Sequence, residues 1–399
     1  MPIADLKMVT TKNYSFNQTL DILKELIQID SVNPTLVPGG AGEKRIAEYL
    51  ASLLREKGLE ADLQQVCGDR FNVVASVRGS RDGPRILLNG HLDTVSVEGM
   101  NSPFAPVQRN GRIFGRGSQD MKGGLAAAIS AVLALAENRH RFRGEVVLSA
   151  VADEEDQSLG TQYFLDHWPK DKTFQFALVL EPTDLKLCTA HKGFAWVEVV
   201  TRGVAAHGSR PNEGVDAIRF MGEILQALDS LDQRIQSGPS HPSLGTGSLH
   251  ASTIQGGREW SSYPDRCILR YERRILPGES AGTVEAEMTA MLSEIKGRVE
   301  KFEAEGRLVC SRRAFETARQ HPALQRFHDV ARSQIPQLVD WGAVSFWTDA
   351  ALLSAAQIPT LVFGPRGAGL HSLEEYVVAS DVVDCARINY QFVLQNRLA

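Results

Sequence analysis

The sequence predicts an α/β protein in which an α+β segment interrupts a layered domain. Short aliphatic runs bounded by Gly, Pro or acidic residues indicate strands of a buried sheet, at residues 72–77, 85–88, 145–151 and 176–180. From about residue 192 to 313 the strand patterns instead alternate as half-exposed strands do, and the buried pattern resumes at residues 359–363. A chain of 399 residues is also long for a single core.

The predicted helices also fall into these two parts of the chain. Apolar residues recur at helical spacing in residues 20–29 and 43–57, and a helix is expected over residues 120–137. In the middle segment, helical patterns alternate with half-exposed strands, at residues 196–202, 215–228, 267–275, 283–295 and 308–313. We therefore predict one domain from residues 1–191 and 314–399, and a second from residues 192–313.

Composition excludes several classes of protein. The formal charge of -5 offers no basic stripe for nucleic acid. The five cysteines are dispersed without a CxxC pair, which favours reduced, buried thiols in a reducing compartment. Residues 1–18 show no secretory signal, and the apolar run at residues 125–136 is shorter than the roughly 20 residues that span a bilayer. We expect a soluble cytoplasmic protein without nucleic-acid or membrane partners.

Three predicted strands end in an imidazole or a carboxylate. His91 and Asp93 follow the strand at residues 85–88, Glu154 and Glu155 follow residues 145–151, and Glu181 follows residues 176–180. Ligand sites of layered α/β sheets form outside the carboxyl ends of strands. These side chains are therefore expected to share one site.

The spacing of these groups suits metal chemistry. His91 and Asp93 lie on one face of an extended segment, so Asp93 can orient the imidazole; the alternative is a surface turn. In the adjacent pair, one of Glu154 and Glu155 can bind metal while the other acts as a base. A solvated acidic loop is the alternative, because acidic residues flank the pair.

Two further candidates are ambiguous when taken alone. Asp120 lies in the glycine-rich run at residues 115–124, and it either caps the following helix or binds metal. His371 is an ordinary loop histidine on its own evidence. Two zinc ions roughly 3.5–4 Å apart need a bridging carboxylate and about five ligands in all, plus a base for the water.

The sequence segments that contain these candidates, taken in chain order, resemble the M20 family of zinc peptidases and deacylases. This family includes acetylornithine deacetylase, succinyl-diaminopimelate desuccinylase and carboxypeptidase G-type enzymes. The matching blocks are GHLDTV, GRGSQDMKGG, DEED, EPT, AAHGSRPNEGVDA, ERRILPGE and FGPRGAGLHSLEEYV. The resemblance runs from about residue 20 to 378. It implies a zinc-hydrolase catalytic domain, with a mostly parallel sheet between helices, and an inserted lid and dimerisation domain.

The resemblance also implies the roles at the site. His91 and Glu181 should bind one Zn²⁺, Glu155 and His371 the other, and Asp120 should bridge them. Co²⁺ or Mn²⁺ are expected substitutes. Glu154 should take a proton from the water and give it to the leaving amine, while Asp93 orients His91.

The insert and the C-terminal part supply further expected roles by resemblance. His207 should reach the partner subunit's active site and stabilise the oxyanion, in a homodimer formed through the lid. Arg274 should bind a substrate carboxylate while Arg273 faces outward, and Thr348 and Gly364 should line the substrate pocket. Many members of the family carry Asn where this sequence has Ser261, so a hydroxyl replaces the side-chain amide at this position.

The resemblance favours a deacylase of amino-acid metabolism that cleaves a small N-acyl amino acid. A di- or exopeptidase acting on short peptides is the alternative. A non-catalytic metal-stabilised binding protein is disfavoured because it needs no base beside Glu155. A serine hydrolase is disfavoured because the chain has no Gly-x-Ser-x-Gly elbow, and a cysteine hydrolase is disfavoured because no cysteine falls in the matching blocks.

Overall fold

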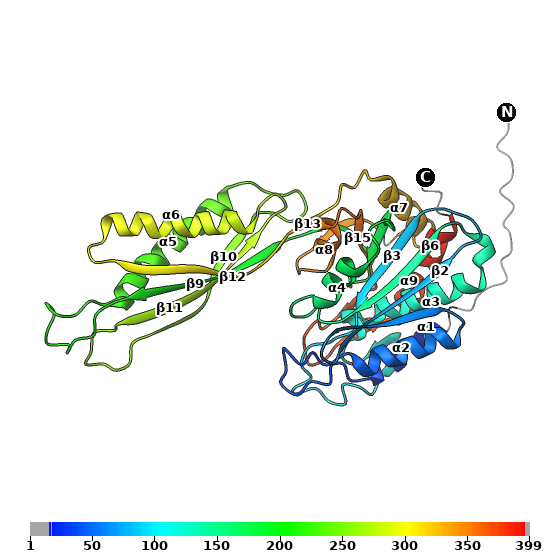
Figure 1. Cartoon of the computed structure of the whole chain (residues 1–399), viewed down its shortest axis with the longest axis horizontal. Helices are drawn as coiled ribbons and strands as arrows, with labels where there is room; N and C mark the ends of the chain where they lie inside the picture. Colours follow the sequence, from blue (N-terminus) through cyan, green and yellow to red (C-terminus); the bar gives the residue numbers. More distant parts are fainter. Residues whose placement is uncertain (1–15, 17, 338, 396–399) are drawn as a thin grey trace. The chain divides into compact units, whose positions relative to one another are not determined.

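The computed structural model describes residue 16 and residues 18–337 and 339–395, and it divides into two compact units (Figure 1). The first unit comprises Met1–Leu185, Pro322–Val339 and Phe363–Ala399, and the second comprises Lys186–His321 and Asp340–Val362. Residues 1–18, in which no secretory signal was found, lie outside the described part except for Phe16 and Gln18. The assignment of residues 1–191, 192–313 and 314–399 to catalytic and lid domains stays a prediction.

The first unit contains a twisted five-stranded run of sheet with the order β1-β2-β6-β3-β7 (Figure 1). Strands β6, β3 and β7 are parallel, whereas β1 and β2 join antiparallel. The strands are β1 (Glu60–Cys67), β2 (Arg70–Arg78), β3 (Arg85–His91), β6 (Glu145–Val151) and β7 (Phe176–Val179). Every residue of β6 and β7 is buried, as expected for central parallel strands.

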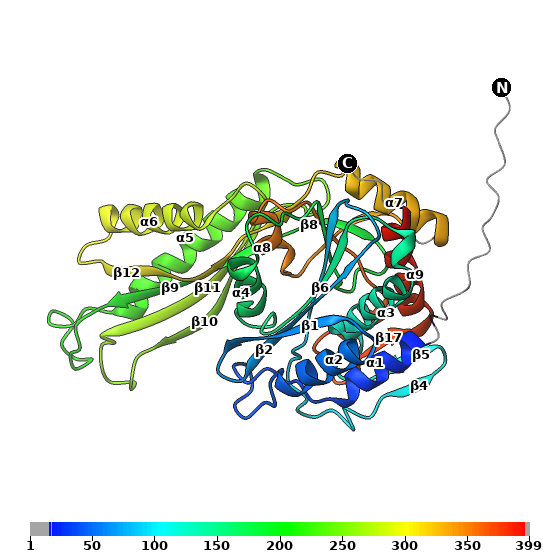
Figure 2. The same cartoon turned by 45° about the vertical axis from the view of Figure 1, so that its right-hand side comes forward.

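Helices cover both faces of this sheet, which confirms the predicted α/β class. The Asn89 side chain of β3 donates to Thr161 of helix α4 (Leu159–His167). The next residue, Gly90, faces Met121 before helix α3 (Gly123–Glu137), because an added Cβ would lie 2.7 Å from the Met121 methyl group. Successive side chains of a strand point to opposite faces. Helices α4 and α3 therefore lie on opposite sides (Figure 2).

Helix α3 is buried around most of its circumference. Its small side chains allow close packing against α1 and α9 on one side and strands β3 and β6 on the other. Among the described residues, no helix is long and apolar enough to cross a membrane. The other elements of the unit are α1 (Gln18–Gln28), α2 (Lys44–Glu56), β4 (Val107–Arg109), β5 (Arg112–Phe114), η1 (Ser118–Lys122), η2 (Arg139–Arg141), α7 (Pro322–Gln334), β16 (Gly367–Ala368), β17 (Tyr376–Val378) and α9 (Ala379–Gln395).

The second unit contains an antiparallel sheet with the order β10-β11-β9-β12 and two helices, α5 and α6, over one face. Alternation decides which side chains meet the helices: Val197 and Leu269 are buried there, whereas Trp196 faces away and is 48% exposed. The elements are β8 (Leu187–His191), β9 (Gly193–Arg202), α5 (Ala217–Ser237), β10 (Ser248–Gly256), β11 (Arg266–Ile275), α6 (Ala281–Arg298), β12 (Glu303–Arg312), β13 (Phe315–Glu316), β14 (Trp341–Val344), α8 (Ala350–Ala355) and β15 (Thr360–Val362).

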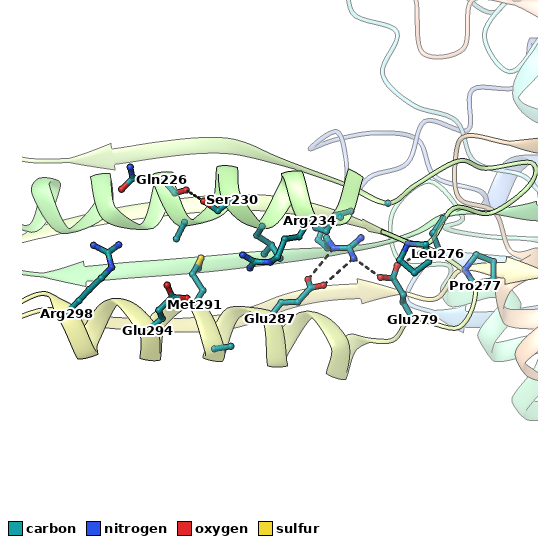
Figure 3. Close-up of a pocket in the computed structure, with 17 residues that line it drawn as sticks. Gln226, Ser230, Arg234, Leu276, Pro277, Glu279, Glu287, Met291, Glu294 and Arg298 are labelled. Carbon is teal, nitrogen blue, oxygen red and sulfur yellow. Dashed lines mark hydrogen bonds and ion pairs between the residues drawn. The ribbon is translucent and has the colours of Figure 1, made fainter. Parts of the chain in front are cut away.

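A groove of about 730 Å³ lies between α5 and α6, and Arg273 contributes to its lining (Figure 3). Arg273 is 2% exposed, so the expectation that it faces outward is wrong. It follows Leu269 and Tyr271 on the helix-facing side of β11. Its guanidinium is compensated by Glu279 at 2.6 Å and by Glu287 at 3.2 Å.

The cysteines form no disulfide, as predicted, but they are not all buried. Cys188, Cys267 and Cys385 are buried and Cys310 is half-buried. Cys67 is exposed, so the prediction of burial is wrong there. The reason is its position at the last residue of β1, beside the turn into β2.

Candidate metal centre

The ends of two parallel strands bring His91 and Glu181 together. Asn89 of β3 is paired with Val179 of β7, and this register carries His91 to the level of Glu181. The Nε2 atom of His91 lies 3.6 Å from Oε1 of Glu181 and 3.1 Å from Oδ1 of Asp120. One imidazole and two carboxylates thus converge at this edge of the sheet.

A second imidazole reaches the other oxygen of Asp120. The Nε2 atom of His371 lies 3.3 Å from Oδ2 of Asp120 and 3.2 Å from Oε2 of Glu155. The two oxygens of Asp120 therefore face two different histidines. This is the arrangement that a carboxylate shared between two cations requires.

The backbone of the Asp120 loop is fixed by a buried carboxylate from the His371 loop. Glu375, which is 1% exposed, accepts hydrogen bonds from the backbone N–H groups of Gly117, Gln119 and Asp120. The Arg116 guanidinium adds an ion pair at 2.7 Å. Because α3 begins only at Gly123 and no side-chain cap is present, the alternative of Asp120 as a helix cap is wrong.

Asp93 contacts both His91 and the adjacent pair Glu154 and Glu155. Its carbonyl accepts a hydrogen bond from Nδ1 of His91 at 2.9 Å, which leaves Nε2 directed at Asp120. Its carboxylate accepts the N–H groups of Glu154 at 3.1 Å and Glu155 at 3.2 Å. The expected orienting contact with His91 is thus made by the carbonyl, since the nearer carboxylate oxygen lies 3.6 Å away.

Glu154 lies beside the cluster. Its Oε2 atom is 4.0 Å from Nε2 of His91, and its side chain is 9% exposed. Among the residues that the structure describes, two groups of side chains have ligand atoms close enough together to hold an ion: His91 with Glu154 and Glu181, and His91 with Asp120 and Glu155. Glu154 is therefore near enough to contact a water molecule bound within the cluster.

In the metal-free protein, the carboxylates hold protons on the imidazoles. Hydrogen bonds to Asp120 and Glu155 raise the pKa of His371 to about 10. Burial would raise the pKa of Asp120, but hydrogen bonds from His371 and His91 outweigh it and lower that pKa. Burial, followed by the charge of Asp120, raises the pKa of Glu155 to about 7. The cluster thus favours positive charge between its oxygens.

The donor atoms fit divalent cations. Ligand atoms of a tetrahedral zinc ion are separated by roughly 3.4 Å, and the imidazole–carboxylate distances here are 3.1–3.6 Å. Direct charge-assisted hydrogen bonds are typically shorter, at about 2.7–2.9 Å. In addition, Oε1 of Glu155 is buried and has no hydrogen-bond partner among the described residues. Clustered buried carboxylates without cations are unfavourable.

Comparison with known proteins identifies the family of the chain that carries this cluster. Residues 87–395 match the family described as Peptidase family M20/M25/M40, and all five candidate ligands fall within the match. The chain belongs to this family. The M20 chain is accordingly a hydrolase of the metallopeptidase and deacylase class.

Individual relatives of the M20 chain have different substrates in their names. It is 29% identical to an acetylornithine deacetylase of Vibrio cholerae serotype O1 over 355 residues, covering 87% of this chain and 89% of the relative. It is 27% identical to an N-formyl-4-amino-5-aminomethyl-2-methylpyrimidine deformylase of Bacillus subtilis over 422 residues, covering 96% and 97%. A dinuclear metal binding peptidase of the M20 family from Bacillus subtilis shares the fold, with a TM-score of 0.70 at 15% identity over 95% of this chain and 97% of that one.

Two residues that were expected to contact the substrate lie in the second unit. His207 lies on a loop of the second unit, bridged to Ser262, and its Nδ1 atom is 2.8 Å from the Ser209 hydroxyl. Arg274 lies on the face of β11 away from the helices, where Glu272 accepts its Nε–H at 2.6 Å. Their catalytic and substrate-binding roles stay predictions.

The two remaining expected residues of the M20 chain are buried. Thr348 is fully buried in the second unit, where its N–H donates to the His191 ring. Gly364 is packed against the strand end that carries Glu181: an added Cβ would lie 2.4 Å from the Glu181 carbonyl oxygen. Their role in lining the substrate pocket stays a prediction.

Sequence reasoning missed the groups that hold the loops. Glu375 fixes the backbone at Asp120, and Asn33, Glu43 and Arg70 contact Asp153, which precedes Glu154. Glu375 lies in the block that carries His371, so its position beside a ligand was the available signal. Asn33, Glu43 and Arg70 lie in no such block.

Proposed function

We propose that the protein is a zinc-dependent deacylase that hydrolyses the amide bond of a small N-acyl-L-amino acid. The observation that carries this proposal is the cluster in which the two oxygens of Asp120 face two imidazoles, with Glu154 beside it. Two of the three relatives described above, those matched at 27–29% sequence identity, have names that denote removal of a small acyl group, acetyl or formyl, whereas the third, at 15% identity, is named a peptidase. The chemistry shared by the two relatives of higher identity supports a deacylase over other hydrolases of the family.

In this proposal five side chains hold two zinc ions. His91 and Glu181 would bind one ion, Glu155 and His371 the other, and Asp120 would bridge them. Imidazole nitrogen and carboxylate oxygen suit Zn²⁺, and Co²⁺ or Mn²⁺ are expected to substitute. Bound zinc would supply Lewis-acid polarisation of the scissile carbonyl and lower the pKa of the attacking water.

Glu154 is the proposed general base. It would accept a proton from the attacking water and then deliver that proton to the nitrogen of the leaving amine. Its backbone N–H is held by Asp93, so the carboxylate enters the site from a fixed direction. Asp93 also keeps Nε2 of His91 directed at the cluster through its carbonyl.

Groups outside the cluster complete the proposal. Arg274 would bind the substrate carboxylate, because a guanidinium fork matches two carboxylate oxygens. His207 would stabilise the oxyanion, and Thr348 and Gly364 would line the substrate pocket. We further propose a cytoplasmic homodimer formed through the predicted lid; the absence of disulfides among the five cysteines is consistent with a reducing compartment.

The test is hydrolysis by the metal-loaded protein of a panel of N-acetyl amino acids, N-succinyl amino acids and dipeptides. Cleavage of the acyl amino acids supports the proposal, whereas cleavage of dipeptides alone would assign a di- or exopeptidase on the same cluster. Chelation should abolish hydrolysis, and Zn²⁺, Co²⁺ or Mn²⁺ should restore it. Full activity of metal-free protein would refute the role of the cluster.

Substitution of Glu154 distinguishes the role of a general base from the role of a metal ligand. Glu154→Gln should keep both metals and lose on the order of 10²–10⁴ in kcat, because the amide cannot accept the water proton. Glu155→Gln is the matched neighbour and should lose metal. If Glu154→Gln lost metal instead, the two roles would be exchanged.

A further inference from the structure

The residue before the proposed base has an unusual backbone conformation. Asp153 is fully buried and has a φ of 67°. Residues with a Cβ adopt this left-handed region uncommonly; Asp does so more readily than most, through hydrogen bonds to its short side chain. The direction of the chain at Asp153 decides where Glu154 and Glu155 point.

Three side chains enforce this conformation. The N–H of Asp153 donates to Oε1 of Glu43 at 3.1 Å. The Oδ1 atom of Asp153 accepts from Nη2 of Arg70 at 2.8 Å and from Nδ2 of Asn33 at 3.0 Å. Both the backbone and the carboxylate of Asp153 are therefore fixed.

Arg70 is the centre of this network. Strand pairing places it there: β2 is antiparallel to β6 with Val73 opposite Ala150, and the same register carries Arg70 opposite Asp153. Its guanidinium makes two bonds of 2.5 Å to the two oxygens of Glu43, and its side chain is 10% exposed. A fork of this kind can hold Glu43 and Asp153 at once, whereas a lysine ammonium is a point charge and cannot reproduce it.

A second link runs from this network to the site. The Nδ2 atom of Asn33 also donates to Asp93 at 2.8 Å, and the Asp93 carboxylate accepts the N–H groups of Glu154 and Glu155. Within the described part of the chain, the Arg70 guanidinium bonds to Glu43, Thr35 and Asp153 and not to a proposed ligand. Its influence on Glu154 therefore passes through Asp153.

We propose that Arg70, oriented by Glu43, is a positioning residue: it holds Asp153 in the left-handed conformation and thereby directs Glu154 at the reacting water and Glu155 at the metal. This inference rests on the function proposed above for Glu154 and Glu155. It adds a requirement for a guanidinium at the start of β2.

The first test uses metal-free protein and does not depend on catalysis. In Arg70→Lys, amide hydrogen exchange of a peptide spanning residues 152–158 should be about tenfold faster than in the wild type, because charge-assisted hydrogen bonds to the loop are lost. The matched control is Arg85→Lys. Arg85 also begins a strand of the same sheet and pairs with a carboxylate, Glu145, at 2.7 Å, but at the opposite end of β3 from His91. Equal exchange in the two variants would overturn the proposal.

The second test measures catalysis. Arg70→Lys should lower kcat of the zinc-loaded enzyme by about tenfold to a hundredfold with little change in KM, because Glu154 is misdirected while substrate contacts remain. Arg85→Lys should match the wild type. An unchanged kcat in folded, metal-loaded Arg70→Lys would show a role in stability only and overturn the proposal.

A double substitution tests the route through Asp153. Glycine adopts a positive φ without strain, so Arg70→Lys should change kcat by less than about twofold when it is added to Asp153→Gly. An undiminished effect in that background would contradict the route. If the wild type hydrolysed none of the acyl or peptide substrates, the proposed function would fail, and the exchange comparison would still decide the role of Arg70.

Discussion

Glu375 offers the sharpest test of how the bridging carboxylate is held. Each of its oxygens accepts two hydrogen bonds: Oε1 from the N–H groups of Gln119 and Asp120, and Oε2 from the N–H of Gly117 and from Arg116. Glu375→Gln keeps the shape and replaces one acceptor by an NH₂ donor. The amide oxygen should stay with the Arg116 cation, which places the NH₂ group against the N–H groups of Gln119 and Asp120.

The magnitude follows from the two bonds that are lost. A hydrogen bond to a charged group contributes about 1.5–3 kcal/mol. Two such losses in a buried site predict a destabilisation of about 3 kcal/mol or more. Because one lost bond is to the N–H of Asp120, the affinity for metal should also fall by roughly 10–100-fold, as for other groups that orient ligands.

The assay is equilibrium unfolding of the metal-free protein in urea, together with metal affinity measured by competition with a chelating indicator. Glu374→Gln is the control, since Glu374 is 71% exposed and lies 3.4 Å from Arg109. It should change stability by no more than about 0.5 kcal/mol. If Glu375→Gln were as stable as Glu374→Gln and bound metal equally well, the assignment of Glu375 as the support of Asp120 would be refuted.

Two further predictions concern other parts of the molecule. Burial lowers the pKa of His191 from 6.5 to about 4, so the unfolded chain binds a proton that the folded chain does not; stability is complete above pH 6.5 and falls by up to about 3 kcal/mol as the pH approaches 4. Urea unfolding across this range should show that extra loss in the wild type and not in His191→Gln, and identical profiles would contradict it. Gly124→Ala should destabilise by about 1–3 kcal/mol or more, because the new Cβ would lie 1.9 Å from the Leu180 carbonyl oxygen. Gly222→Ala, in an exposed helical position with open space, should stabilise by up to about 1 kcal/mol; thermal unfolding that ranked the two variants in reverse would count against the packing at Gly124.

The strand ends of the site could be predicted from the sequence because parallel strands carry their last residues to one edge. This reasoning predicts one shared site for His91, Glu154, Glu155 and Glu181. Asp120 and His371 could not be grouped in this way, since an irregular turn and a distant loop deliver them. Their grouping with the other candidates came from the family resemblance, and the structure places Nε2 of His371 3.3 Å from Oδ2 of Asp120.

The orientation of Arg273 and Arg274 was within reach of the sequence. Leu269 and Tyr271 are the apolar positions of their strand, and the period of two puts Arg273 on the same face. The expectation that Arg273 faces outward followed from assigning Arg274 to the substrate by resemblance, whereas two acidic partners make burial of the Arg273 guanidinium possible. Those partners lie 6 and 14 residues further along the chain, where a strand pattern gives no information.

The hydrogen-bond network around Asp153 was beyond sequence reasoning for a different reason. Its members come from a loop, a helix boundary and the start of a strand, and each is an ordinary polar residue in its own segment. Only the register of β2 against β6 brings Arg70 to Asp153. Strand register depends on which face of each strand is buried and on the connecting turns, and neither identifies Arg70 and Asp153 as partners.

Because the proposed ligands lie far apart in the sequence, the two proposed metal sites become complete at different times during synthesis of the chain. His91, Asp120 and Glu181 have all been synthesised by residue 181, whereas His371 follows 190 residues later. At about 5–20 residues per second, a ribosome needs on the order of 10–40 s for that interval. During it, the growing polypeptide carries every donor for one ion and lacks the last donor for the other. The second proposed ion therefore cannot be fully coordinated until the C-terminal segment has been synthesised.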